Sequence, residues 1–444
     1  MRLLDRGIFM IVTKFGGSSV ASAQQFQKVK HIIDSNPDRK IVISSAVGKK
    51  NSDDNKVTDL LYLLFAHIQY SVSFEHLYQV LVDKFVNIKN ELGLTYDIEA
   101  ELDVIHSQLK KGISQDYLVS RGEYLTSLLM AEYLGYTFVD AKDVMRFSYN
   151  GKLDMEESER AIRQKYTQYG NLVIPGFYGA LPDGSIRVMS RGGSDITGSI
   201  VAKALEADVY ENWTDVSGIL MADPRIIDNP KWIEVITYSE LRELSYMGAN
   251  VLHEDAIYPV KEANIPILIK NTNAPNDPGT KIVDMVENEP KSQKITGISG
   301  KRDFTVFTIY RHNSSNEVGI LRKALEVFEK YNVSVEHVPS GIDNFSVVVA
   351  TSSIEKCLYE IAAELKQVCN TDSIKVTGNI SLIAVVGRNM ASQCGMSGRV
   401  FKTLGDHNIN IRMIAQGSDE INIIVGVENE DFKKAIQVIY NEFS

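Results

Sequence analysis

Residues 12–22, VTKFGGSSVAS, place a lysine, a glycine pair and two serines at the end of an apolar run. A strand before this stretch and a helix after it would leave free backbone N–H groups at Gly16 and Gly17, where the helix dipole favours an anion. Lys14 adds a full positive charge at the same point. The stretch suits a phosphate group, although its spacing matches neither GxxxxGK[ST] nor GxGxxG, and a plain strand-to-helix turn is the alternative.

A second stretch, VMSRGGSDITGSIVAKAL at 188–205, repeats the order of strand, glycine pair and helix. We expect Ser194 or Asp195 to cap this helix. Arg191 could bind a carboxylate through two N–H groups, and Asp195 could orient a lysine. The alternative is that Arg191 and Asp195 pair with each other across the turn.

Two further polar stretches are candidates for ligand binding. Thr214, Asp215, Asp223 and Arg225 lie along NWTDVSGILMADPRI, a loop that follows a strand-like run. Such loops on α/β scaffolds commonly handle polar ligands, although DPR also makes a sound turn. Glu123, in SRGEYLTSLL, is placed at the beginning of a helical run, where it could accept from a substrate ammonium or only offset the helix dipole.

These residues belong to a region of alternating strands and helices, from residue 10 to about 285. Short β-branched or aromatic runs such as RKIVISSAV, NLVIPGFYG and IPILIKN alternate with amphipathic stretches such as VTDLLYLLFAHIQYSV. This alternation predicts an α/β domain with a mainly parallel sheet, whose ligands gather at the carboxyl ends of the strands. The first helix should bury the face formed by Val20, Phe26, Val29, Ile32 and Ile33. Prolines and charges at 273–294 predict a domain boundary.

The last 140 or so residues contain an internal repeat with an offset of 76 residues. GILRKALEVFEKYNVSV from Gly319 aligns with GMSGRVFKTLGDHNINI from Gly395, and the flanking runs FTVFTIY and ISLIAVV align without a gap. The order strand, helix, strand, strand, helix is that of a ferredoxin-like βαββαβ module. Because neither repeat concentrates acids or nucleophiles, the pair could be structural, dimerising or a small-molecule sensor.

Composition limits the class of protein. A net charge of −10 argues against broad nucleic-acid binding, and no apolar run approaches the ~20 residues of a membrane span. The start of the chain does not resemble a cleavable signal, and Met10 could be the natural first residue. Cys357, Cys369 and Cys394 lack metal-ligand spacing, so we expect buried thiols in a reducing cytoplasm, and the scattered histidines make a metal centre improbable.

Taken together, KFGGSS, VSRGE, SRGGSD, WTDVSGILMADPRI, YMGANVLHEDAIYPV and QGSDEINI closely resemble the aspartate kinases of the amino acid kinase family. The resemblance implies transfer of the γ-phosphoryl of ATP, with Mg²⁺, to the β-carboxylate of L-aspartate, the first step of lysine, threonine and methionine biosynthesis. It implies a catalytic domain over 10–285 and two ACT domains over 294–372 and 373–444, with strands exchanged between them. The end at Ser444 implies a monofunctional kinase without an attached homoserine dehydrogenase.

The resemblance also implies roles for the candidate residues. Lys14 and Asp195 would be catalytic, with Asp195 holding Lys14. The substrate-binding residues would be Ser45, Thr58, Glu123, Arg191 and Ser194. The nucleotide-binding residues would be Lys14, Gly16, Gly17, Ser18, Thr214, Asp215, Asp223 and Arg225. Three departures from the family pattern are the long loop 48–56 before Thr58, Leu220 in place of a common tyrosine, and Asn250 in place of a lysine.

For regulation, the resemblance implies that an end-product amino acid binds the first ACT repeat at Gly319, Leu321, Val335 and Glu336. Glu336 could meet the side-chain ammonium of lysine, or it could be an exposed strand carboxylate; threonine is a second possible effector. ACT domains of this family pair between chains, so we expect a homodimer or homotetramer. The alternatives are another amino acid kinase, acting on glutamate or acetylglutamate, and a catalytically silent sensor.

Overall fold

The computed structural model describes residues 9–190, 192–248, 252, 256–286, 295–312, 318–388, 390, 393–417 and 419–444. Its contacts divide the chain into two units. The first comprises Met1–Ile219, Glu234–Tyr238 and Val251–Val286, and the second comprises Leu220–Ile233, Ser239–Asn250 and Glu287–Ser444. Two short segments from the middle of the chain therefore belong with the C-terminal unit, while the predicted domain limits stay a prediction.

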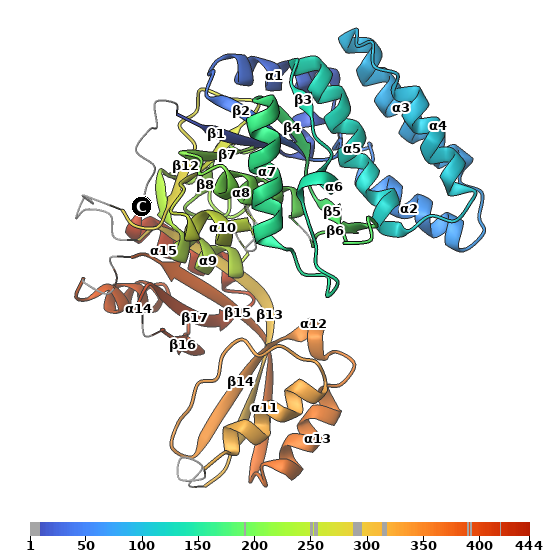
Figure 1. The fold of residues 1–444 in the computed structure, drawn as a ribbon. Coiled ribbons are helices and arrows are strands. Elements are labelled where there is room, and N and C mark those ends of the chain that lie inside the picture. Colours follow the sequence, from blue (N-terminus) through green and yellow to red (C-terminus); the bar gives the residue numbers. More distant parts are fainter. Residues whose placement is uncertain are drawn as a thin grey trace. The chain divides into compact units, whose positions relative to one another are not determined.

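The first unit is built on an eight-stranded sheet with the order β10-β12-β11-β7-β1-β2-β4-β3 (Figure 1). Every neighbouring pair is parallel except β11 and β12, which confirms the predicted α/β fold with a mainly parallel sheet. The strands are β1 (Ile11–Phe15), β2 (Arg39–Ser44), β3 (Thr137–Phe138), β4 (Leu172–Pro175), β7 (Val209–Thr214), β10 (Val235–Thr237), β11 (Ile267–Asn271) and β12 (Thr280–Val283). Two small two-stranded sheets pair β5 (Tyr178–Ala180) with β6 (Ile186–Val188) and β8 (Ile219–Leu220) with β9 (Trp232–Ile233).

Helices cover both faces of this sheet. α5 packs on β2, β3 and β4 and on α1 and α2, while α8 packs on β1, β2 and β7 and on α7 and α10 (Figure 1). The helices are α1 (Ala23–Asp34), α2 (Val57–Gln69), α3 (Glu75–Leu92), α4 (Ile98–Leu109), α5 (Gln115–Leu134), α6 (Ala141–Val144), α7 (Met155–Tyr169), α8 (Gly193–Ala204) and α10 (Ile257–Glu262). The five residues predicted to form the inward face of the first helical region are all buried, as expected: Val20, Phe26, Val29, Ile32 and Ile33.

The second unit contains one antiparallel sheet with the order β14-β13-β15-β17-β16. Its strands are β13 (Gly297–Tyr310), β14 (Asn344–Ala350), β15 (Ser373–Val386), β16 (Met413–Ala415) and β17 (Asn422–Glu428), and its helices are α11 (Ile320–Lys330), α12 (Thr351–Ile354), α13 (Leu358–Val368), α14 (Met396–Asp406) and α15 (Phe432–Phe443). The long strands β13 and β15 pair with each other from Gly297 to Tyr310. They join the two ACT repeats into a single sheet.

The repeat read from the sequence is visible in the backbone. β15 and α14 begin 76 residues after β13 and α11, and Gly319 and Gly395 start the two helices with φ of 84° and 86°. Asn332 and Asn408 follow the helices with φ of 55° and 57°, a left-handed conformation that asparagine tolerates. The strand expected after α11 is reduced to isolated bridges at His337 and Ser340, so the repeats are less regular than the pattern indicated.

Helix α9 (Tyr238–Tyr246) lies between two strands of the eight-stranded sheet in sequence, yet from Ser239 onward it belongs to the second unit. Glu240 on this helix is fully buried. Its carboxylate accepts from Thr296 Oγ1 at 2.5 Å, from the Arg388 backbone N–H at 2.9 Å and from Arg388 Nη1 at 2.7 Å. Buried charges need such partners, so these contacts fix α9 to the residues that precede β13 and follow β15.

The three cysteines differ in burial. Cys369 is buried, but Cys357 is half-buried and Cys394 is exposed beside the start of α14, so the expectation of three buried thiols is wrong for Cys394. None of the helices in the described ranges is long and apolar enough to cross a membrane.

Candidate active site

The carboxyl ends of β1, β2 and β7 meet at the middle of the sheet, where β1 has β2 on one side and β7 on the other. Ligands bind at such switch points in open α/β sheets. A cavity of about 880 Å³ lies here. The predicted residues that line it are Lys14, Gly16, Gly17, Ser18, Ser45, Thr58, Glu123, Ser194, Asp195, Thr214 and Asp215. Segments as far apart in sequence as β1 and α8 therefore contribute to one site.

Lys14 forms the charged centre of this cavity. Its Nζ lies 2.6 Å from Asp195 Oδ1 and 3.4 Å from Asn212 Oδ1, and Asn212 Nδ2 donates to Asp195 Oδ1 at 2.8 Å. The three side chains come from β1, α8 and β7, and parallel pairing sets Lys14 beside Asn212. The ammonium is thus held in one place by a carboxylate and an amide. Asn212 was not predicted, although a polar residue inside the buried run VYENWT was a usable signal.

The expected capping of the helix after the second glycine pair differs from the structure. Gly192, with φ of 82°, is the N-cap of α8 and offers no side-chain cap, while Ser194 and Asp195 lie in the first turn. The carboxylate of Asp195 bonds Lys14 and Asn212 instead of the helix N-terminus. Glycine is needed at 192 because the backbone there is left-handed. Arg191, together with its expected pairing or carboxylate role, lies outside the described residues.

The first glycine pair opens a short 3₁₀ turn, Gly17–Val20, and α1 begins only at Ala23 with Ser22 as its cap. The expected α-helix dipole at Gly16 is therefore wrong. Gly16 N–H donates to Trp213 O at 3.0 Å, whereas the N–H groups of Gly17 and Ser18 have no acceptor in the described part of the chain. A Cβ at Gly48 would lie 2.5 Å from Gly17 C and O, so the facing loop must have glycine there. Two free donors and Lys14 remain at the cavity wall.

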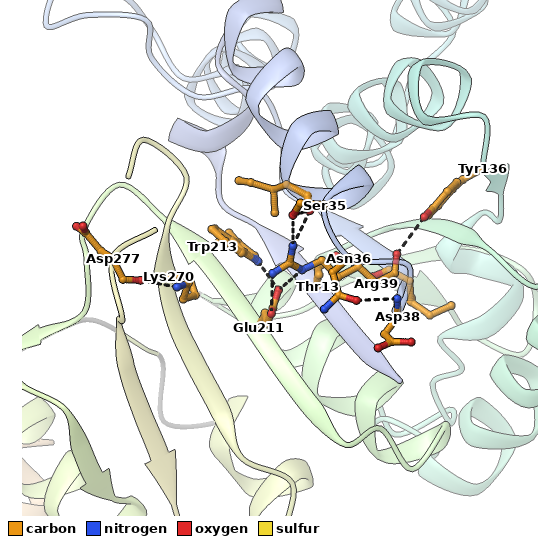
Figure 2. A network of polar contacts seen from close by, with 12 residues as sticks. Thr13, Ser35, Asn36, Asp38, Arg39, Tyr136, Glu211, Trp213, Lys270 and Asp277 are labelled. Atoms are coloured by element: carbon orange, nitrogen blue, oxygen red, sulfur yellow. Dashed lines mark hydrogen bonds and ion pairs between the residues drawn. The ribbon is translucent and has the colours of Figure 1, made fainter. Parts of the chain in front are cut away.

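A buried polar network fixes the strand that supports this corner (Figure 2). Glu211 accepts from Arg39 Nε at 2.9 Å, from Arg39 Nη2 at 3.2 Å and from Trp213 Nε1 at 2.8 Å. The Arg39 guanidinium lies 5.3 Å from the centroid of the Trp213 ring, and Lys270 Nζ lies 5.7 Å from it. The network fixes Trp213, and the carbonyl oxygen of Trp213 accepts a hydrogen bond from the Gly16 N–H. The network therefore also helps to position the glycine turn.

Glu123 lies in the third turn of α5, which begins at Gln115, so the alternative of first-turn dipole compensation is wrong. Its side chain lines the cavity and is 5% exposed. Its Oε2 has no hydrogen-bond partner among the described residues. Burial in this setting is the main cause that raises the pKa of Glu123 from 4.5 to about 8. Backbone hydrogen bonds from Ala46 and from Glu123 itself lower this pKa but do not offset the effect of burial. The unpaired Oε2 therefore costs stability when the group is ionised, unless a ligand supplies a cation.

Thr58 and the long loop before it add charge to the cavity. Thr58 is the second residue of α2, and Lys49 and Lys56 from loop 48–56 also line the cavity, together with Asp59 and Tyr62. Asp54 anchors the loop through an ion pair of 2.6 Å with Lys84. The two loop lysines were not among the predicted residues, although a loop rich in lysine beside a phosphate site was visible in the sequence.

The predicted nucleotide residues fall into two groups. Thr214 and Asp215 line the cavity of the first unit, with Thr214 Oγ1 donating to Asp215 Oδ1 at 3.1 Å. Asp223 and Arg225 belong to the second unit and pair with each other, since Arg225 Nε lies 3.0 Å from both Asp223 oxygens. These contacts agree with the alternative that DPR forms a turn. Hydrogen bonding from Arg225 lowers the pKa of Asp223. Leu220 ends β8, while Asn250 lies outside the described residues.

The predicted effector residues lie around the start of α11. Gly319 is the N-cap of α11, Leu321 is partly exposed, and Val335 packs against the core of the first ACT repeat. Glu336 is half-buried, and its Oε2 accepts a hydrogen bond from the Tyr246 hydroxyl of α9. The alternative of a simple exposed carboxylate is thus wrong for Glu336. A cavity of about 460 Å³ lies at the matching point of the second repeat, beside Gly395.

Comparisons with known proteins agree with this geometry. The family model "Amino acid kinase family" matches residues 9–271, and an ACT domain model matches 383–443. Aspartokinase 3 of Bacillus subtilis is 36% identical over 98% of both chains. The aspartate kinase structure of Clostridium acetobutylicum is 48% identical with a TM-score of 0.93, covering 98% of this chain and 100% of that one. E. coli aspartokinase III with aspartate and ADP is 25% identical with a TM-score of 0.76, covering 98% and 99%. The chain therefore belongs to the amino acid kinase family, and within it to the aspartate kinases.

Proposed function

We propose that the chain transfers the γ-phosphoryl of ATP to the β-carboxylate of L-aspartate, giving 4-phospho-L-aspartate and ADP. The observation that carries this proposal is the unpaired Oε2 of Glu123 in the same cavity as the Lys14–Asp195 pair. A substrate with an ammonium would supply the missing partner of Glu123, while Lys14 attracts the anionic phosphoryl group. The structure of E. coli aspartokinase III contains both aspartate and ADP, which supports the same pair of ligands.

The reaction needs no general base. A free aspartate side chain has a pKa of ~3.9, so its carboxylate is ionised at pH 7 and already nucleophilic. One carboxylate oxygen forms a bond to the γ-phosphorus, the bond from that phosphorus to the β,γ-bridging oxygen breaks, and ADP leaves with the electron pair. Because both reactants are anions, the protein must mainly neutralise and align them.

We infer that Lys14 contacts the transferring phosphoryl, with Asp195 and Asn212 holding its ammonium in place. The free N–H groups at Gly17 and Ser18 would bind phosphate oxygens, with Gly16 shaping the turn. Their placement at the end of β1 supports this role, since backbone donors at a strand end form anion sites. Lys49 and Lys56 would add positive charge to the ATP phosphates.

Mg²⁺ would enter as the complex with ATP. The described residues contain no group of three or more His, Cys, Asp or Glu side chains that could hold a metal ion. Mg²⁺ does not need such a group, because it commonly binds through substrate phosphates and one or two carboxylates. Asp215 at the cavity wall is our candidate for such a carboxylate. When bound, the ion would neutralise phosphate charge.

For the second substrate, we infer that Glu123 accepts from the aspartate ammonium and Arg191 binds its α-carboxylate. Ser194 would donate to a carboxylate oxygen, and Ser45 and Thr58 would supply the remaining hydroxyl groups. Glu123, Ser194, Ser45 and Thr58 line the described cavity, whereas Arg191 lies outside the described residues. For the nucleotide, Thr214 and Asp215 are the supported contacts; Asp223 and Arg225 would first have to exchange their mutual pair for ATP.

We also infer feedback inhibition by an end-product amino acid of the pathway, with lysine preferred over threonine. An E. coli aspartokinase III structure with lysine and aspartate supports lysine. Glu336 would bind the lysine side-chain ammonium, and Gly319, Leu321 and Val335 would shape the site. Assembly as a homodimer or homotetramer through the ACT repeats, in the cytoplasm, is part of the same proposal.

The test is a hydroxamate assay on the purified protein with ATP, Mg²⁺ and L-aspartate, in which hydroxylamine traps the acyl phosphate. We expect product that depends on aspartate and falls when lysine is added. Product with glutamate or acetylglutamate but not aspartate would show a different amino acid kinase. No product from folded protein that binds ATP would show a silent sensor and refute the proposal.

A further inference from the structure

The first unit contains a second cavity, of about 550 Å³, which uses different residues of α5 from those that line the site described above. Its wall comes from α4, the loop before α5, α5 itself, the beginning of α6 and the turn between β5 and β6. Arg121 lines this second cavity and Glu123 lines the first. Two residues along an α-helix point roughly 200° apart, so α5 separates the two cavities.

Arg121 is 5% exposed, yet no carboxylate in the described part of the chain lies within ion-pair distance of it. Its Nε donates to Tyr117 O and to Ser120 Oγ, and its Nη2 donates to Ser120 Oγ at 2.9 Å. No acceptor among the described residues pairs with Nη1. A guanidinium carries five N–H donors, and a buried charge without an opposite charge is rare. Arg121 therefore offers unused donors to the cavity.

Three tyrosine rings hold this guanidinium in place. Its Cζ lies 4.5 Å from the ring centroid of Tyr117, 4.3 Å from that of Tyr124 and 5.4 Å from that of Tyr178. Such cation–π contacts stabilise a buried arginine without neutralising it. The side chain is thus pre-organised, which lowers the entropy that a ligand would have to remove on binding.

The two carboxylates in the cavity wall already have donors. Asp140 accepts from the Tyr178 hydroxyl at 2.8 Å and lies 3.5 Å from Lys142 Nζ. Glu101 accepts from Tyr96 at 3.0 Å and from Tyr124 at 3.3 Å. Lys111 adds a further positive charge to the lining. The cations of the wall therefore outnumber its acids, and the acids are occupied by tyrosine hydroxyls.

We propose that this cavity binds a small organic oxyanion, a carboxylate or phosphate ester, through the free donors of Arg121. The guanidinium fork fits either group in a bidentate manner. The cavity has room for more than the anionic group itself, and the rings of Tyr117 and Tyr124, which line it, would contact the remaining part of the ligand. This site is separate from the proposed aspartate and ATP site, and it does not depend on that assignment.

Calorimetric titration of the full chain with inorganic phosphate, and separately with succinate, tests the proposal. Arg121→Gln should weaken binding of at least one probe by about tenfold or more, because a charged hydrogen bond is lost. Lys14→Met, which removes one of the cations of the first cavity, should leave unchanged the component of binding that Arg121→Gln weakens. Arg121→Lys, which keeps the charge but not the fork, should give an intermediate affinity. The probe that binds distinguishes a phosphate from a carboxylate ligand.

The opposite pattern would overturn the proposal. If neither probe binds, or if binding is lost with Lys14→Met and kept in Arg121→Gln, the second cavity is not an oxyanion site and Arg121 is structural. Lys142→Gln provides a second variant at the half-exposed rim of the cavity, where a folding defect is not expected. Arg121→Gln could fail to fold, and Lys142→Gln then decides the outcome. Binding that is weakened several-fold in Lys142→Gln supports the site. Unchanged binding in a folded Lys142→Gln counts against it.

Discussion

Replacing Glu123 by glutamine should stabilise the protein without ligand, and the gain should depend on pH. Burial raises the pKa of Glu123 from 4.5 to about 8 in the folded chain. Between these values the unfolded chain loses the proton and the folded chain keeps it, so stability falls as pH rises. Each pH unit in this window is worth about 1.4 kcal/mol, which gives a ceiling of about 5 kcal/mol above pH 8. Glutamine keeps the shape of the side chain and has no such cost.

Urea unfolding of wild type and Glu123→Gln at pH 5 and pH 8.5 measures this effect. We expect similar stability at pH 5 and a more stable variant at pH 8.5, with a difference of at most about 5 kcal/mol. Glu91→Gln, at an exposed glutamate of α3, is the matched control and should show no such pH dependence. A difference that stays constant between the two pH values, or a less stable variant at pH 8.5, would refute the reasoning.

The same pair of proteins also tests whether Glu123 binds L-aspartate. Its ammonium should supply the partner that Glu123 Oε2 lacks, so aspartate should raise the unfolding midpoint of wild type and release a proton on binding near pH 7. In Glu123→Gln, the shift caused by aspartate should be lost or strongly reduced, because the carboxylate that binds the ammonium is absent. Equal stabilisation of both proteins by aspartate would show that Glu123 does not contact the substrate.

Three further substitutions test other parts of the structure. Asp195→Asn should lower kcat by roughly 10–1,000-fold with a smaller effect on KM for aspartate, because Lys14 loses its ion pair; an unchanged kcat would contradict the role of the pair. Glu211→Gln should cost about 3–5 kcal/mol in urea unfolding because it leaves Arg39 buried without its charge partner. Tyr246→Phe should lower the lysine concentration for half-inhibition about fivefold, since the phenol no longer competes for Glu336; unchanged inhibition would separate Glu336 from the effector.

The sequence predicted the scaffold well because its signals are local. Alternation of apolar runs indicated the parallel sheet, and the offset of 76 residues between Gly319 and Gly395 indicated two similar ferredoxin-like modules. The side chains grouped by motif, such as Lys14 and Asp195, do meet in one cavity. Carboxyl ends of neighbouring parallel strands lie at one edge, so motifs that follow strands come together even when they are far apart in sequence.

The contacts that were missed depend on which strands are neighbours. Arg39, Glu211 and Trp213 share a buried network only because β2 and β7 flank β1 on opposite sides, and strand order is not encoded in any local pattern. The start of helix α5 was also predicted wrongly, because the signal that sets it lies outside the motif. Glu123 was assigned to a first turn because the cap at Ser114 lies nine residues earlier, beyond the motif that drew attention to it.

Helix α9 belongs to the second unit from Ser239 onward, whereas the strand before it belongs to the first, so the chain passes from one unit to the other at this point. Glu240 anchors this helix to Arg388 and Thr296 of the ACT sheet, and Tyr246 at its end bonds the predicted effector carboxylate of Glu336. The strand that precedes the helix, β10, pairs with β12 in the catalytic sheet. If Glu336 binds the effector as proposed, an effector that displaces Tyr246 would act on a helix that follows directly after a strand of the eight-stranded sheet. The covalent chain would then supply one route from the effector to the proposed active site.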